Sequence, residues 1–176
     1  MTALNVVRAA VVSALFGFCA CAVHADEVRL DVNGRSWHAS KPPAWPAHDW
    51  NQNNAGIGLQ YVTKADDEGW RSRFTAGTMR DSLGVNGEYT GAGRDYAWES
   101  ESFKWSAGWM VMVMNRTLSF NQPNKRLYVA PLPVASLEHK ASGVGVNAVF
   151  VPEVSLNGQK LPSTLFLSLS YKIDSY

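Results

Sequence analysis

Alternation of apolar and polar residues with a period of two constrains the fold of this chain more than any other feature. Val28, Leu30 and Val32, for example, are separated by single charged residues. Successive side chains of a β-strand point to opposite faces, so this spacing predicts strands with one apolar face and one polar face. Turn residues recur between the alternating segments, and helical periodicity is absent after the first 25 residues. The chain is therefore predicted to be an all-β protein.

Eight segments of this kind can be counted, each long enough to cross a bilayer as a tilted strand, which takes about 9–11 residues. An even number of antiparallel strands behind a secretory leader is typical of outer-membrane barrels, in which closure satisfies every backbone polar group. Seven tryptophans, mostly near predicted strand ends, suit the aromatic girdles of such barrels. We expect an eight-stranded antiparallel transmembrane β-barrel. Its predicted strands are residues 27–39, 53–64, 70–81, 88–99, 102–114, 126–138, 143–152 and 163–174.

A soluble, lipocalin-like barrel is the alternative, because its strands alternate as well. Such a barrel must place its large side chains inside. In this chain, glycine, serine and charged residues often occupy the second face of the predicted strands. The pattern therefore favours a barrel whose large apolar side chains face lipid.

Residues 1–25 have the features of a secretory signal peptide. Arg8 supplies a positive charge, an apolar run follows it, and small residues precede Asp26. The apolar run is short for a membrane-spanning helix. We therefore divide the chain into a signal peptide, residues 1–25, and one outer-membrane barrel domain, residues 26–176.

Composition excludes several classes of function. Cys19 and Cys21 both lie in the leader, so a chain cleaved after Ala25 has no thiol chemistry and no disulfide; lipid attachment at one of them is the alternative. Loss of Arg8 with the leader leaves equal numbers of basic and acidic residues, and no basic run suggests a nucleic-acid partner. The sequence has no glycine-rich phosphate loop and no metal-ligand cluster, so we expect neither cofactor nor metal.

Chain connectivity brings two distant motifs to one end of the predicted barrel. The first strand ends at His38 and the third ends at Asp81 and Ser82, both at the outer rim if the N-terminus is periplasmic. Histidine accepts a proton near neutral pH, and an adjacent carboxylate can orient it or stabilise its cation. His38, Asp81 and Ser82 are therefore candidate catalytic residues for acyl transfer, with Ser82 either attacking an ester or only positioning a hydroxyl.

Several further motifs occur in order across residues 36–173. Together with His38 and the Asp-Ser pair, they make the chain resemble the outer-membrane lipid A palmitoyltransferase family (PagP). The motifs are Trp37-His38-Ala39, Gly56-Ile57-Gly58-Leu59, an acidic turn before Gly69-Trp70, Arg80-Asp81-Ser82, Asn115-Arg116, Ala130-Pro131-Leu132-Pro133, Ala135-Ser136-Leu137 and Val149-Phe150-Val151-Pro152.

The resemblance implies a slightly tilted barrel whose internal apolar pocket measures acyl-chain length. It implies an acyltransferase that moves a palmitoyl chain from a phospholipid donor to a hydroxyl of lipid A in lipopolysaccharide. His38, Asp81 and Ser82 fall on the family's catalytic motif, and Arg116 falls near a family arginine. The enzyme would act in the outer membrane as a monomer, without metal or nucleotide.

The chain also departs from the family pattern. The glycine that floors the family's pocket maps to Gly93 when no gap follows Ser82, and to Ala97 when residues 96–99 are matched instead; Ala97 would shorten the pocket. The family's amphipathic helix before the first strand has no room here, because Asp26 leads almost directly into the first strand.

Two other classes of function remain open. A lipid hydrolase on the same type of barrel would keep the histidine and serine but release fatty acid. A non-catalytic small barrel in adhesion or envelope integrity would tolerate loss of both. Three alternating methionines, Met110, Met112 and Met114, either line an acyl pocket or simply fill the barrel.

Overall fold

A computed structural model describes residues 27–42, 48–117, 124–156 and 159–175. The predicted signal peptide, residues 1–25, lies outside this part of the chain. No helix among the described residues is long and apolar enough to cross a membrane.

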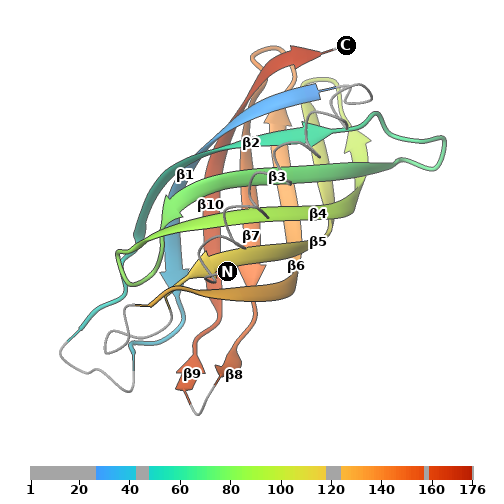
Figure 1. Cartoon of the computed structure of the whole chain (residues 1–176). Helices are drawn as coiled ribbons and strands as arrows, with labels where there is room; N and C mark the ends of the chain where they lie inside the picture. The colour runs from blue at the N-terminus through green and yellow to red at the C-terminus, as the bar shows by residue number, and fades with distance from the viewer. Residues whose placement is uncertain (1–26, 43–47, 118–123, 157–158, 176) are drawn as a thin grey trace, which may run out of the picture.

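Eight antiparallel strands close into one barrel (Figure 1), as the alternation predicts. β1 pairs with β2 on one side and with β10 on the other, which closes the sheet. The barrel strands are β1 (Glu27–His38), β2 (Asn53–Val62), β3 (Trp70–Arg80), β4 (Asn86–Glu99), β5 (Phe103–Arg116), β6 (Arg126–His139), β7 (Val144–Val151) and β10 (Thr164–Ser175).

A small hairpin between β7 and β10 is not part of the predicted strand set. It consists of β8 (Val154–Leu156) and β9 (Gln159–Leu161), which form a separate two-stranded sheet (Figure 1). Pro152 follows the last residue of β7, and proline has no backbone N–H for a further ladder bond. The chain therefore leaves the barrel before the hairpin begins.

Polarity in the barrel is inverted relative to a soluble protein. Arg73 and Asp95 point inward and are only 5% and 1% exposed, whereas Trp109 and Val129 on the outer face are each 63% exposed. An outer wall covered with large apolar side chains would be unstable in water but is suited to hydrocarbon. The soluble lipocalin-like alternative is therefore excluded, and the barrel spans a membrane.

Aromatic side chains gather on the outer face near one end of the barrel. The ring centroids of Tyr96 and Trp98 on β4 lie 6.1 Å apart, and those of Phe103 and Trp105 on β5 lie 6.4 Å apart. Trp98 and Trp105 are register partners across the two strands. This arrangement matches the aromatic girdle expected at a membrane interface.

The two ends of the barrel differ in the length of their connections. At the end where β1 begins, here called the lower end and drawn toward the upper right of Figure 1, strands are joined by residues 63–69, 100–102 and 140–143. Gly69 closes the first of these turns with a φ of 89°, a conformation that costs glycine little. At the upper end, where β1 finishes, the connections 39–52, 117–125 and 152–163 are longer, whereas the connection 81–85 is short.

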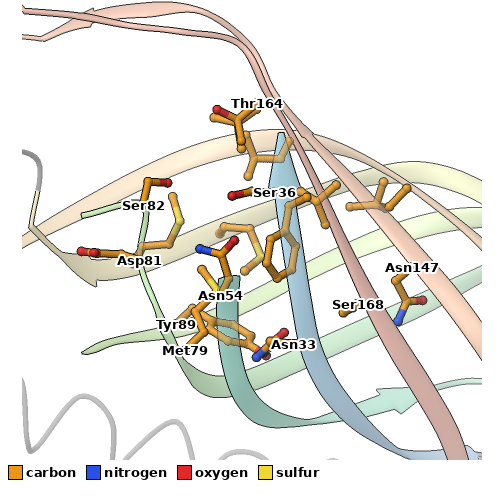
Figure 2. A pocket seen from close by; sticks show the side chains of 18 of the residues that line it. Asn33, Ser36, Asn54, Met79, Asp81, Ser82, Tyr89, Asn147, Thr164 and Ser168 are labelled. Atoms are coloured by element: carbon orange, nitrogen blue, oxygen red, sulfur yellow. Dashed lines mark hydrogen bonds between the residues drawn. The ribbon is translucent and has the colours of Figure 1, made fainter. Parts of the chain in front are cut away.

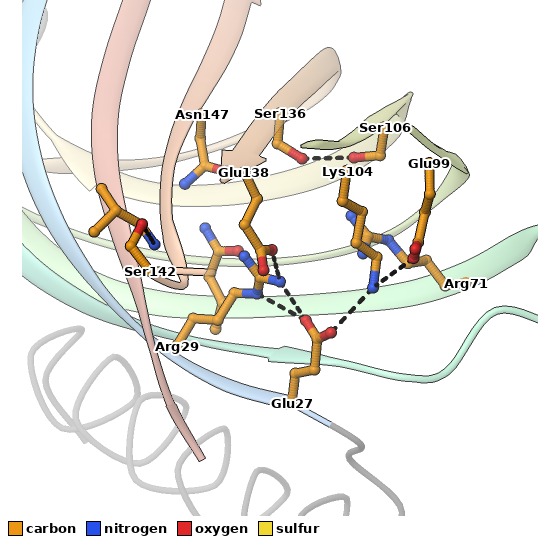
Figure 3. A network of polar contacts seen from close by, with 12 residues as sticks. Glu27, Arg29, Arg71, Glu99, Lys104, Ser106, Ser136, Glu138, Ser142 and Asn147 are labelled. Carbon is orange, nitrogen blue, oxygen red and sulfur yellow. Dashed lines mark hydrogen bonds and ion pairs between the residues drawn. The ribbon is translucent and has the colours of Figure 1, made fainter. Parts of the chain in front are cut away.

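Charged side chains fill the lower half of the barrel interior (Figure 3). Glu27 accepts hydrogen bonds from Arg29 and from Lys104, whose Nζ lies 3.0 Å away, and Arg29 also pairs with Glu138. Further up, Asp95 pairs with two arginines. We call this the lower polar network; it consists of Glu27, Arg29, Arg71, Arg73, Asp95, Lys104 and Glu138.

Candidate functional site

A β-bulge in β1 turns His38 toward the interior. The pairing of β1 with both neighbouring strands shifts at Gly34. Below the shift, Asn33 faces inward and is 5% exposed; above it, Ser36 faces inward and is 2% exposed. Strict alternation from Asn33 would place Trp37 inside and His38 outside. Because the bulge adds one residue, Trp37 faces outward and is 43% exposed, while His38 lines the interior.

The carboxylate of Asp81 holds the short connection between β3 and β4. Its Oδ1 accepts hydrogen bonds from the backbone N–H groups of Leu83 and Val85, both at 2.9 Å. Its Oδ2 accepts a 3.1 Å hydrogen bond from the backbone N–H of Thr117, at the end of β5. These bonds fix Ser82 at the upper rim of the barrel.

His38 and Ser82 meet at the upper end of the interior. The Nε2 atom of His38 lies 2.9 Å from the Oγ atom of Ser82, within hydrogen-bond distance. The imidazole is stacked on Trp50, with centroids 5.1 Å apart and planes 20° apart. The backbone N–H of Asn51 donates to the carbonyl of Ser82 at 2.8 Å. Two residues separated by more than forty positions thus form a pair supported by the loop that contains Trp50.

The expectation that Asp81 orients the histidine requires a correction. Its carboxylate accepts hydrogen bonds from three backbone N–H groups. The Nδ1 atom of His38 is buried and has no hydrogen-bond partner among the described residues. Asp81 therefore acts on the site by positioning Ser82, and the Trp50 ring fixes the imidazole plane. Sequence reasoning missed Trp50 because stacking between a loop and a strand end leaves no local pattern.

An apolar cavity opens directly below the His38–Ser82 pair. Its volume is about 140 Å³, roughly ten times the space that one ordered water needs. Met110, Met112 and Leu132 form a buried cluster on its wall. Methionine side chains are flexible and fit chains of varied shape. The inward methionines therefore line a cavity that suits a flexible apolar chain.

Neither Gly93 nor Ala97 lines this cavity, which corrects the predicted pocket floor. Both face the barrel interior, since Gly93 pairs with Met110 and Ala97 with the buried Ser106. Along β4, Asp95 of the lower polar network lies above Ala97, and the sulfur atoms of Met110 and Met112 lie close to Gly91, one inward position above Gly93. The polar residues that line the cavity at depth are Asp31, Gln60, Arg73, Asn147 and Ser168, and Figure 2 shows the last two at the far end from Ser82.

A cation lies at the upper end of the same cavity. Arg116, the last residue of β5, is partly buried and lines the cavity together with His38 and Ser82. Its Nε atom is buried and has no hydrogen-bond partner among the described residues. A guanidinium with a free donor is suited to an anionic group such as a phosphate. No group of three or more metal-ligating side chains was found among the described residues.

Among known proteins, the chain is similar only in fold, to solved barrel structures of low sequence identity. No protein-family model and no curated protein matches the chain. Among solved structures, Ail of Yersinia pestis, determined with the heparin analogue sucrose octasulfate, is 13% identical with a TM-score of 0.40; the match covers 84% of this chain and 97% of Ail. The N-terminal β-barrel domain of Pseudomonas aeruginosa OprF is 13% identical with a TM-score of 0.43, and the match covers 84% and 98%.

The polarity and closure of the barrel determine where the protein resides. A closed antiparallel barrel with a polar interior and an apolar exterior leaves no backbone edge unpaired in hydrocarbon. Closed barrels with an even strand number and this polarity are the architecture of outer-membrane proteins. The chain is an eight-stranded β-barrel of the outer membrane.

Proposed function

We propose that this protein is a lipid acyltransferase that moves a palmitoyl or similar chain from a phospholipid to lipid A at the outer face of the outer membrane. One observation carries the proposal: the His38–Ser82 pair, at 2.9 Å, lies at the mouth of an apolar cavity inside a membrane barrel. A base and a hydroxyl at that position suit an ester bond whose acyl chain occupies the cavity.

The chemistry follows from the tautomer that the pair requires. For Nε2 of His38 to accept a proton, Nδ1 carries the ring hydrogen. The base takes a proton from the attacking hydroxyl, which belongs to Ser82 or to the acceptor lipid, as a new ester bond forms at the carbonyl carbon. The donor ester bond breaks, and the protonated imidazole returns the proton to the departing lysophospholipid oxygen. If Ser82 is the attacking group, His38 then takes the proton of the acceptor hydroxyl, the lipid A ester forms at the same carbonyl carbon, and the bond to Oγ of Ser82 breaks as Oγ regains a proton. Arg116 at the same rim supplies a positive charge for a lipid phosphate.

The identity of the lipids rests on the family resemblance, and mass spectrometry of lipid A tests it. A host without such an enzyme would express the wild type, His38→Ala or Ser82→Ala, each shown to be folded in the outer membrane. We expect lipid A to gain one acyl chain with the wild type. With either variant, the amount of acylated lipid A should fall at least about a hundredfold, as is usual for loss of general base catalysis.

Other outcomes of this experiment identify the alternatives. Loss of an acyl chain from lipid A, or release of free fatty acid that depends on His38, would indicate a hydrolase in which water is the acceptor. Unchanged lipids with folded wild-type protein present would indicate a non-catalytic barrel and contradict the proposal.

Asp81→Ala is expected to lower acyl transfer roughly a hundredfold without shifting its dependence on pH. The change removes three backbone hydrogen bonds and frees Ser82, and misplacement by about 1 Å can cost this much. Asp81→Asn retains an acceptor oxygen for Leu83 and Val85, so we expect an intermediate rate. Rates measured across a pH series check this; a displaced pH profile in Asp81→Asn would instead give the carboxylate a direct electrostatic role on His38.

A further inference from the structure

Two buried polar atoms in the upper cavity lack hydrogen-bond partners. The Oγ atom of Ser36 and the Oδ1 atom of Asn54 are each without a partner among the described residues, and both residues are only 2% exposed. Both residues line the cavity, from the neighbouring strands β1 and β2 (Figure 2). Buried polar groups without partners cost free energy, so such a pair facing a cavity indicates a ligand that supplies the missing bonds.

The orientation of the Asn54 amide defines the chemistry of this position. Its Nδ2 donates a 2.8 Å hydrogen bond to the backbone carbonyl of Arg80. A flipped amide would place Oδ1 against that carbonyl oxygen, where neither atom can donate. The free Oδ1 therefore requires a donor, whereas the hydroxyl of Ser36 can donate or accept.

A hydroxyl group combines the donor and the acceptor that these two atoms require. It can donate its hydrogen to Oδ1 of Asn54 and accept a hydrogen bond from Ser36. An ester carbonyl would satisfy Ser36 but not Asn54, and a plain hydrocarbon segment would satisfy neither. Ser36 lies two residues from His38 on the same inward face, about 7 Å along the strand, so the hydroxyl would be near the carboxyl end of a bound chain.

We propose that Ser36 and Asn54 form a hydroxyl-binding subsite below the His38–Ser82 pair. Among the palmitoyl-like chains of the proposed reaction, the subsite favours those that carry a hydroxyl group near the carboxyl end over palmitoyl itself, which still fits the apolar cavity. The proposal rests on the proposed function in one respect, namely that the cavity holds an acyl chain.

Equilibrium binding to the folded barrel in detergent micelles tests the subsite. The Ser82→Ala background prevents turnover, and the probes are hexadecanoic acid and 3-hydroxyhexadecanoic acid, each displacing a fluorescent fatty acid. We expect the Ser36→Ala change to weaken binding of the hydroxy acid about tenfold, as loss of about one hydrogen bond predicts, and to leave hexadecanoic acid unchanged. Comparison between variants cancels the different partitioning of the two acids into micelles.

Ser170→Ala is the matched control. Ser170 is 3% exposed and its Oγ also lacks a partner among the described residues, but it does not line the cavity. This change should leave the affinity for both acids unaltered. Each of the two changes, Ser36→Ala and Ser170→Ala, removes only an unpaired hydroxyl, so each variant should still fold.

Three results would overturn the subsite. If Ser36→Ala weakens the binding of both acids equally, or of neither acid, Ser36 and Asn54 bind only water. If Ser170→Ala has the same effect as Ser36→Ala, the change acts through general packing. If neither acid binds to the parent barrel, the cavity is no acyl site, and the proposed function fails together with the subsite; the first two results leave that function intact.

Discussion

Insertion of one alanine between Gly34 and Arg35 is expected to reduce acyl transfer at least about a thousandfold while the barrel still forms. The bulge at Gly34 is what places Ser36 and His38 inside. Because the side-chain period of a strand is two, one more residue turns His38 toward lipid and Trp37 toward the cavity. The site then loses its base and its hydroxyl-binding serine together. Lipid A mass spectrometry measures the loss, and the mobility of unheated protein on a gel shows whether the barrel is folded.

The matched control is a single alanine inserted between His48 and Asp49. These residues are exposed in the connection between β1 and β2, beyond the end of the strand. The control lengthens the chain equally but does not change which side chains of β1 point into the barrel, so we expect activity within about tenfold of the wild type. If the Gly34 insertion retained comparable activity, the bulge would not determine the direction of His38.

Asp95→Ala is expected to lower the free energy of unfolding by about 3–5 kcal/mol, the usual cost of leaving a buried charge unpaired. The Nε atom of Arg71 donates to Oδ1 of Asp95 at 2.6 Å, and Nε of Arg73 donates to Oδ2 at 2.9 Å. The side chains of these arginines are 3% and 6% exposed, so water cannot readily replace the carboxylate. Urea titration of the refolded barrel, followed by tryptophan fluorescence, measures the change.

Asp49→Asn provides the comparison for an exposed ion pair. Asp49 lies 3.3 Å from the Nζ atom of Lys41, and the two side chains are 79% and 84% exposed. Such surface pairs contribute about 0–1 kcal/mol to stability. The Asp49→Asn control should therefore unfold at a urea concentration close to the wild-type midpoint. If Asp95→Ala lowered the free energy of unfolding by less than about 1 kcal/mol, water would have to enter the lower polar network and solvate its arginines.

The barrel itself could be predicted from the sequence because strand alternation is a local property. Each strand needs one face for lipid and one for the interior, so apolar residues such as Val28 and Leu30 repeat at a spacing that can be read without knowing their neighbours. Connectivity alone also brought His38 and Ser82 to the same end, since successive antiparallel strands reverse direction. The β8–β9 hairpin escaped prediction because its strands are three residues each, too short for a periodic signal.

The direction and partners of the site residues were decided only by the tertiary structure. Alternation continued from Val28 would point His38 at lipid, and the bulge that reverses it depends on how β1 pairs with two distant strands. Two of the backbone N–H groups that bind Asp81 are local, but the third, from Thr117, reaches it only because the strands bring the end of β5 to the same rim. Whether Ser36 is left without a partner depends likewise on which side chains surround the cavity. Local pattern determines which residues form strands, whereas contacts between residues far apart in the chain determine which atoms meet.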